Sequence, residues 1–274
     1  MKLFLANETA HSVDALRNSL PHAVLLTGPR GIGLRTIADS IAHDSISGYI
    51  EPTDAKGEVD ATSGLIRITQ IRDLTQHAIN KSRSDRIYII DDADKMNSQA
   101  QNAFLKLLEE PAPRVHFILL AHNDEGLLPT IRSRAQTVRV SPIDRASSEE
   151  LLDLLRVIDS KTRAQLLFLA EGLPAELHRL ATDSELFAQK ARTISKARQL
   201  LQGTTLEKCS LINELSTDRT QTLETLSYAQ RIIQHSLHEH PTSELIARAD
   251  LISTAYDRIV ANGYIRIQLA RLVV

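Results

Sequence analysis

The stretch that decides the fold reads Arg86-Ile-Tyr-Ile-Ile-Asp-Asp-Ala-Asp-Lys-Met-Asn-Ser-Gln-Ala-Gln-Asn-Ala-Phe-Leu-Lys-Leu-Leu-Glu-Glu-Pro-Ala112. Residues 86–90 form a mostly apolar run that predicts a buried strand, and this strand ends in paired carboxylates at Asp91 and Asp92. An amphipathic helix follows and stops at Pro111. A buried strand that delivers acids to its carboxyl end is how a nucleotide-binding sheet positions magnesium. The stretch therefore predicts a sheet of the nucleotide-binding type.

A glycine loop precedes this stretch. Ala23-Val-Leu-Leu-Thr27 predicts a strand that leads directly into Gly28-Pro-Arg-Gly-Ile-Gly33, and the residues after it have a helical period. Strand, glycine loop and helix in this order form the context that a phosphate loop requires. The first and last glycines of the loop stand at the spacing of the motif G-x-x-x-x-G-K-[ST], with Gly31 between them.

The lysine and the hydroxyl of that motif are missing. Leu34 stands at the lysine position and supplies no charge, and Arg35 stands at the hydroxyl position and supplies no oxygen ligand for magnesium. Arg35 and Thr36 do not replace them one residue late, because one residue rotates a helical side chain by about 100° and should point both away from the phosphates. Two interpretations remain open, namely weak nucleotide binding by the backbone of Gly28–Thr36 and a turn that binds nothing.

Strands and helices alternate through the first half of the chain. Residues 44–64 are polar and predict a surface loop, and Thr69 is the expected N-cap of a helix to Asn80. Lys81–Asp85 follows as a basic turn, for which we favour a solvated loop over a contact with DNA. The predicted strands are residues 23–27, 65–68, 86–90, 115–120 and 137–140. This order predicts a parallel five-stranded sheet covered on both faces, with residues 86–90 at its centre.

Composition limits the classes of protein. The chain has 274 residues and a formal net charge of −2, which gives no support for strong autonomous binding to nucleic acid. Cys209 is its one cysteine, so an internal disulfide or a cysteine-rich zinc site cannot form. Residues 1–8 turn polar too early for a signal peptide, and no apolar run approaches the ~20 residues of a membrane helix. We expect a cytoplasmic protein.

Together these segments resemble the AAA+ clamp-loader family. The likeness rests on the glycine loop, on Ile89-Ile-Asp-Asp-Ala-Asp94, on Gln101-Asn-Ala-Phe-Leu-Lys-Leu-Leu-Glu-Glu-Pro111 and on Leu128-Pro-Thr-Ile-Arg-Ser-Arg134. The resemblance covers about residues 20–140. Within the family, the chain most resembles subunits of the delta-prime type from bacterial DNA polymerase III. Beyond Pro142 it rests on domain order and length. The resemblance implies an AAA+ nucleotide-binding-like domain at 1–142, a helical lid at 143–183 and a helical collar domain at 184–274.

The resemblance also assigns roles to single residues. Asp91 falls at the family's magnesium-associated acid and Asp92 at its catalytic glutamate, although both are equally well read as a solvated strand end. Ser133 and Arg134 match a Ser-Arg-Cys motif whose arginine reaches the ATP site of the neighbouring subunit, and the alternative is an ordinary surface arginine. Ala175 stands where the family's lid has an arginine that senses the subunit's own ATP.

The function implied is that of a scaffold within the clamp loader that is not itself an ATPase. Its partners would be motor subunits of the gamma/tau type, a delta-type subunit and, through the assembly, the sliding clamp and primer-template DNA, with no membrane partner. We expect no cofactor of its own and no metal, because ATP is bound by the partner subunits and residues 44–64 lack the cysteines of the family's zinc module. The alternatives are an active motor-type ATPase and a stand-alone interaction protein that kept the fold.

Overall fold

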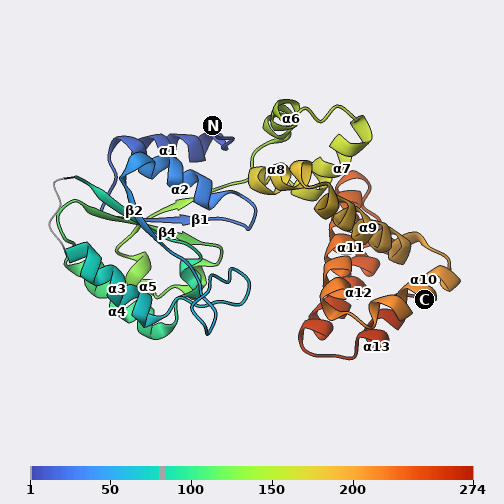
Figure 1. Cartoon of the computed structure of the whole chain (residues 1–274). Coiled ribbons are helices and arrows are strands. Elements are labelled where there is room, and N and C mark those ends of the chain that lie inside the picture. The colour runs from blue at the N-terminus through green and yellow to red at the C-terminus, as the bar shows by residue number, and fades with distance from the viewer. Residues whose placement is uncertain (1, 80–83, 274) are drawn as a thin grey trace. The chain divides into compact units, whose positions relative to one another are not determined.

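The computed structural model describes residues 2–79 and 84–273 and divides into two compact units, Met1–Thr182 and Asp183–Val274 (Figure 1). The basic turn predicted at residues 81–85 falls largely outside the described residues, as does Asn80. Each unit has its own secondary structure and is described separately. The glycine loop, the acidic strand end and the Ser-Arg motif all belong to the first unit.

A parallel five-stranded sheet forms the centre of the first unit, in the order β2-β3-β4-β1-β5. The strands are β1 (Ala23–Thr27), β2 (Ile46–Ile50), β3 (Arg86–Ile90), β4 (Val115–Ala121) and β5 (Gln136–Arg139). Consecutive residues of β1 face opposite sides of the sheet, so Val24 and Leu26 enter one core and Leu25 enters the other. The prediction of a parallel sheet covered on both faces is confirmed.

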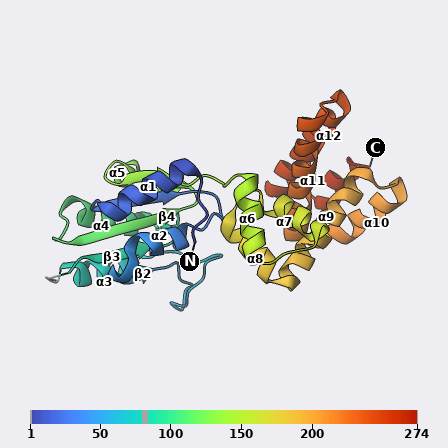
Figure 2. The same cartoon turned by 90° about the horizontal axis from the view of Figure 1, so that it is seen from above.

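Helices cover the two faces of this sheet. The helices α1 (Asn7–Asn18) and α2 (Leu34–Ala42) pack on one face and are seen over the sheet from above in Figure 2. The opposite face carries α3 (Ile68–Ile79), α4 (Ser98–Glu109) and the short α5 (Pro129–Arg132). Three 3-10 turns complete the connections at η1 (His43–Ser45), η2 (Ala93–Lys95) and η3 (Asp124–Gly126).

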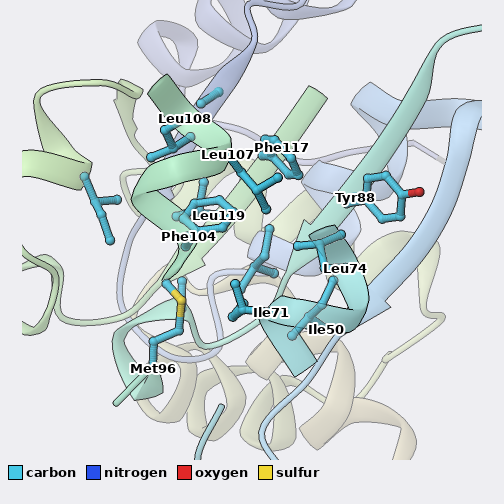
Figure 3. Close-up of a cluster of buried hydrophobic side chains, with 14 of the residues drawn as sticks. Ile50, Ile71, Leu74, Tyr88, Met96, Phe104, Leu107, Leu108, Phe117 and Leu119 are labelled. Atoms are coloured by element: carbon cyan, nitrogen blue, oxygen red, sulfur yellow. The ribbon is translucent and has the colours of Figure 1, made fainter. Parts of the chain in front are cut away.

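The largest side chains of the second face form one aromatic and aliphatic core (Figure 3). Phe117 of β4 lies between Phe104 of α4, at 5.2 Å between ring centroids, and Tyr88 of β3, at 6.2 Å. Asn97 caps α4, because its side chain accepts a hydrogen bond from the backbone of Ala100. The predicted apolar face of α4 is therefore buried against the sheet, and it fixes the helix that follows the acidic strand end.

The second strand of the sheet was predicted in the wrong place. Residues 65–68 do not form a strand, and the strand is instead β2 at Ile46–Ile50, inside the segment predicted to be a loop. This strand lies at the edge of the sheet and pairs only with β3, so it needs no continuous apolar run. Its Gly48 packs against the ring of Tyr88.

Two further expectations differ from the structure. The strand β3 is an interior strand but β4 occupies the centre of the sheet, since β4 is the longer and is buried along nearly its whole length. The helix α3 begins at Ile68, so Thr69 lies within its first turn and does not cap it. Both differences leave the carboxyl ends of β1, β3 and β4 side by side at one edge of the sheet.

Helices make up the remainder of the chain. The first unit ends with α6 (Arg145–Leu154), α7 (Ser160–Ala170) and α8 (Pro174–Thr182). The second unit contains α9 (Ser184–Gln202), α10 (Thr205–Leu215), α11 (Arg219–Glu239), α12 (Ser243–Val260) and α13 (Ile265–Ala270). Within the part of the chain that the structure describes, none of the helices has the length and apolar character needed to cross a bilayer.

Candidate functional site

The glycine loop makes the strand-to-helix turn that its sequence predicts. Gly31 and Gly33 have φ angles of +87° and +95°, which other residues rarely adopt. A Cβ on Gly28 would lie 2.9 Å from the carbonyl oxygen of Val140, so this position also requires glycine. The helix α2 begins directly after Gly33, and Thr36 lies partly buried in its first turn. The loop is therefore a tight turn between β1 and α2 that requires glycine at three positions.

The side chain at the lysine position points into the protein interior. Leu34 is 3% exposed and belongs to the same core as Ile37, Ile41 and Leu26. An apolar side chain in this core contributes to folding and leaves the glycine loop without the cation that neutralises the β- and γ-phosphates. Leu34 therefore supplies neither a charge nor a side chain directed at the loop.

Arg35 binds the first acid of the strand end. Its Nη1 donates to Oδ2 of Asp91 at 2.8 Å and to Oε1 of Glu51 at 3.0 Å, and its guanidinium lies 3.7 Å from the ring centroid of Tyr49. Burial disfavours its charge, but the hydrogen bonds to the two carboxylates outweigh this effect and raise the pKa of Arg35 above its ordinary value. Its long side chain reaches back to the carboxyl end of β3, a contact that the sequence did not predict, while the expectation that Arg35 points away from the phosphates stays a prediction.

Cationic side chains also surround the second acid. Asp92 is 5% exposed and adopts a φ of +45°, and its carboxylate lies 3.1 Å from Nη2 of Arg30 and 3.1 Å from Nζ of Lys95. Nε2 of His122 is 3.6 Å from the same carboxylate. Asp92 is therefore a buried, paired carboxylate, and the interpretation of a solvated strand end does not hold for it.

Sequence reasoning missed His122, which links the loops after three neighbouring strands. It follows the last residue of β4, and its Nδ1 donates to the carbonyl oxygen of Gly28 at 2.8 Å while Nε2 faces Asp92. Its backbone N–H donates to Oδ1 of Asp94 at 3.2 Å. A polar residue directly after a buried strand at the carboxyl edge was the signal that could have identified it.

The helix α8 contacts the glycine loop directly. The backbone N–H of Glu176 donates to the carbonyl oxygen of Gly31 at 2.9 Å, and a Cβ on Gly31 would lie 2.9 Å from the Cβ of Glu176. A Cβ on Gly33 would lie 3.4 Å from the Cβ of Ala175, whose methyl side chain carries no charge. Arg179, one turn later, forms an ion pair with Glu176 at 2.6 Å.

The Ser-Arg motif lies at the end of α5. Nη2 of Arg134 is 3.0 Å from Oε1 of Glu109 at the end of α4, and its Nη1 donates to the carbonyl oxygen of Thr130 at 3.2 Å. The Arg134 side chain remains 39% exposed. Ser133 donates to the same carbonyl oxygen and, with Arg132 beside it, lines an open depression on the surface. The motif thus places a positively charged group on the protein surface.

A second residue that sequence reasoning missed joins α4 to α5. Gln101 is buried, and its amide donates to the carbonyl oxygens of Met96 and Gly126 at 3.1 and 3.0 Å. Its Oε1 accepts a hydrogen bond from the backbone of Leu128 at 2.7 Å. These bonds hold the start of α5, and with it the Ser-Arg motif, against α4. A buried glutamine on the apolar face of a helix was the available signal.

The chain is similar to known proteins of chromosome replication. Residues 48–144 match the family described as DNA polymerase III, delta subunit. The chain is 31% identical over 202 residues to the delta-prime subunit of DNA polymerase III from Pseudomonas aeruginosa, across 66% of this chain and 61% of that protein. It is 33% identical over 160 residues to the DNA polymerase III gamma subunit of Buchnera aphidicola, across 51% of this chain and 43% of that protein.

A solved structure has the same fold. The crystal structure of a DNA polymerase III gamma-subunit-related protein from Thermotoga maritima aligns with a TM-score of 0.54 and 17% identity, over 95% of this chain and 97% of that one. The chain spans less than two thirds of the length of the sequence relatives above, at 61% and 43%. The motifs, the sheet order and the sequence relatives all indicate similarity to clamp-loader proteins. The chain is similar to clamp-loader subunits of DNA polymerase III, a delta-prime subunit among them.

Proposed function

We propose that this chain is a delta-prime-type clamp-loader subunit of a bacterial replicative DNA polymerase and does not hydrolyse ATP itself. It would supply Arg134 to the ATP site of a neighbouring motor subunit and so help to place the sliding clamp on primed DNA. The observation that carries the proposal is the 2.8 Å contact between Arg35 and Asp91, the acid aligned with the family's magnesium-associated residue.

This contact opposes the chemistry of a magnesium site. Magnesium is held near a triphosphate by carboxylate and hydroxyl oxygens. In this chain Oδ2 of Asp91 accepts from Arg35, and Oδ1 accepts from the backbone N–H of Asp92 at 3.0 Å. The position that should provide a hydroxyl provides a fixed cation instead, and like charge repels a metal ion from the same place.

The second acid is also poorly suited to catalysis. A general base must have a carboxylate oxygen free to accept a proton from the attacking water. Oδ1 of Asp92 is paired with Arg30 and Oδ2 with Lys95, so cations already engage both carboxylate oxygens. With Leu34 buried at the lysine position, these features support a site that has lost turnover.

The surface position of Arg134 supports its role as an arginine finger. Such an arginine stabilises the charge that develops on the transferred phosphoryl group of a neighbour and contributes roughly 10³–10⁵ in rate. Arg134 is exposed, and α4 and α5 both contact its guanidinium. The guanidinium is therefore both available to a partner and restrained in direction.

We propose three functional domains, with the AAA+ domain at 1–142, the lid at 143–183 and the collar at 184–274. The collar would hold the ring of gamma/tau-type and delta-type subunits together. The second compact unit keeps large apolar side chains on its surface that subunit contacts would cover. They are Leu206, Ile246, Leu251, Val260, Tyr264 and Ile267.

The test is reconstitution of the loader with its motor subunits. Arg134→Ala should assemble normally and lower DNA-stimulated ATP turnover by about 10³-fold. Arg145→Ala, at an arginine whose side chain is 81% exposed on α6, is the matched control and should leave turnover unchanged. An Arg134→Ala loader with full turnover would remove the finger role.

An active motor-type ATPase is the second candidate, because the spacing of Gly28 and Gly33 and the position of Asp91 are those of a working site. Titration of the isolated chain with ATP and ADP in the presence of magnesium, followed by a turnover assay, separates the two candidates. Turnover that Asp91→Asn abolishes would favour the motor. A third candidate, a stand-alone interaction protein, predicts that the chain does not co-elute with loader subunits in size-exclusion chromatography.

A further inference from the structure

We infer that Glu109 is a positioning residue for the arginine finger. Its carboxylate would hold the guanidinium of Arg134 in the direction that the neighbour's phosphate requires, while leaving part of the guanidinium free to donate. The inference rests on the proposed function, because it assigns a task to Glu109 only if Arg134 acts on another subunit.

The contacts of Arg134 leave donors available. A guanidinium carries five N–H donors. Nη2 forms an ion pair with Glu109 and one N–H of Nη1 donates to the carbonyl oxygen of Thr130, so Nε–H is among the donors that no contact given for the described residues uses. Glu109 therefore does not have to release Arg134 before the finger binds a phosphate oxygen.

Rigid elements supply both anchors. Glu109 is the last residue of α4, and the preceding Leu107 and Leu108 are buried in the core beneath the sheet. Thr130 lies in α5, whose start is fixed to α4 by Gln101. An arginine held at two points by packed helices has lost the rotamer freedom that an unrestrained surface arginine keeps.

The exposure of the Glu109–Arg134 ion pair indicates that the pair does not serve folding stability. The side chains of Glu109 and Arg134 are 52% and 39% exposed, and an ion pair this exposed adds little to folding stability. Its removal should leave the melting temperature nearly unchanged and should act on turnover. The neighbouring Glu110 is the matched control, because it is also exposed and forms no ion pair with any residue that the structure describes.

The experiment compares loaders reconstituted with Glu109→Ala, Glu109→Gln and Glu110→Ala in DNA-stimulated ATP turnover. Misdirecting a catalytic group commonly costs about tenfold or more in rate, so Glu109→Ala should lower kcat about tenfold with little change in KM. Glu109→Gln keeps an acceptor oxygen without the charge and should retain more of the rate. Glu110→Ala should match the unmodified chain, and all three should melt and assemble normally.

A double variant supplies a readout that a merely structural role would not move. If Glu109 acts only through Arg134, then Arg134→Ala and Glu109→Ala/Arg134→Ala should have the same kcat, because the two effects do not add. Additive losses, or a kcat for Glu109→Ala that equals or exceeds that of the unmodified chain, would overturn the inference alone. If Arg134→Ala left DNA-stimulated ATP turnover unchanged, both the proposed function and this inference would be overturned.

Discussion

Arg35 and Asp91 form an ion pair at 2.8 Å across the place where the glycine loop meets the carboxyl end of β3. The two residues come from α2 and from the end of β3, and Glu51 after β2 accepts from the same guanidinium nitrogen at 3.0 Å. One arginine thereby ties together three segments that are distant in the sequence. In an ATPase of this fold, the same acid would be associated with a bound ion.

The ion pair should contribute measurably to stability. We expect Arg35→Ala to lower the free energy of unfolding by about 1–2 kcal/mol, below the range for fully buried pairs, because the Arg35 side chain is 35% exposed and solvent screens part of the interaction. Arg30→Ala is the control, since its side chain is 59% exposed and Asp92 keeps Lys95 as a partner. Urea denaturation measures both variants, and equal losses would contradict the role given to Arg35.

The contact between α8 and the glycine loop predicts a difference between two glycines. Gly31 and Gly57 have similar φ angles of +87° and +91°, but only Gly31 has a close neighbour, the Cβ of Glu176. Gly57→Ala should cost about 1 kcal/mol in strain, and Gly31→Ala about 1–3 kcal/mol more. Amide hydrogen exchange at Glu176 should speed up only in Gly31→Ala. Equal destabilisation without faster exchange would mean that α8 does not hold the loop.

Stability should fall in mildly acidic solution through His22. Its Nδ1 donates to the carbonyl oxygen of Val115 at 3.0 Å, and its buried Nε2 has no hydrogen-bond partner among the residues that the structure describes. Burial lowers the pKa of His22, more than the hydrogen bond to Val115 raises it, and His116 adds a smaller effect of the same sign as burial. The unfolded chain then binds the proton more readily, so stability is lost as the pH falls below about 6.5.

Two variants isolate this contribution. His22→Asn keeps a donor near the position of Nδ1 and removes the titration, so its free energy of unfolding should decline less between pH 7.5 and 5.5 than that of the unmodified chain. His11→Asn changes an exposed histidine and should keep the full pH dependence. A His22→Asn curve parallel to that of the unmodified chain would show that His22 is not responsible.

The parts of the fold that could be predicted are those with a local pattern. The strands β1, β3 and β4 are apolar runs, and the buried face of α4 repeats with the helical period, so the sequence was sufficient for them. The edge strand β2 contains Ser47 and Gly48 and has one neighbour, and no local pattern distinguishes it from a loop. Its place depends on β3, which lies far along the chain.

The polar contacts of the site could not be predicted from local sequence patterns. The sequence indicates that Leu34 cannot act as a lysine, but it does not indicate that Arg35 bonds to an acid in another segment. His122 and Gln101 act through contacts with the backbone of loops, and such contacts have no period. The family could be recognised from its motifs. The roles of Ser133, Arg134 and the glycine loop in binding stay predictions.

The cation beside Asp91, at the carboxyl edge of this sheet, is the side chain of Arg35 and not a bound ion. A guanidinium remains charged throughout the physiological pH range, so the charge beside Asp91 cannot be lost by dilution. Its presence does not vary with the concentration of divalent ions around the protein. Removal of divalent ions by a chelator would therefore leave this contact of Arg35 with Asp91 intact.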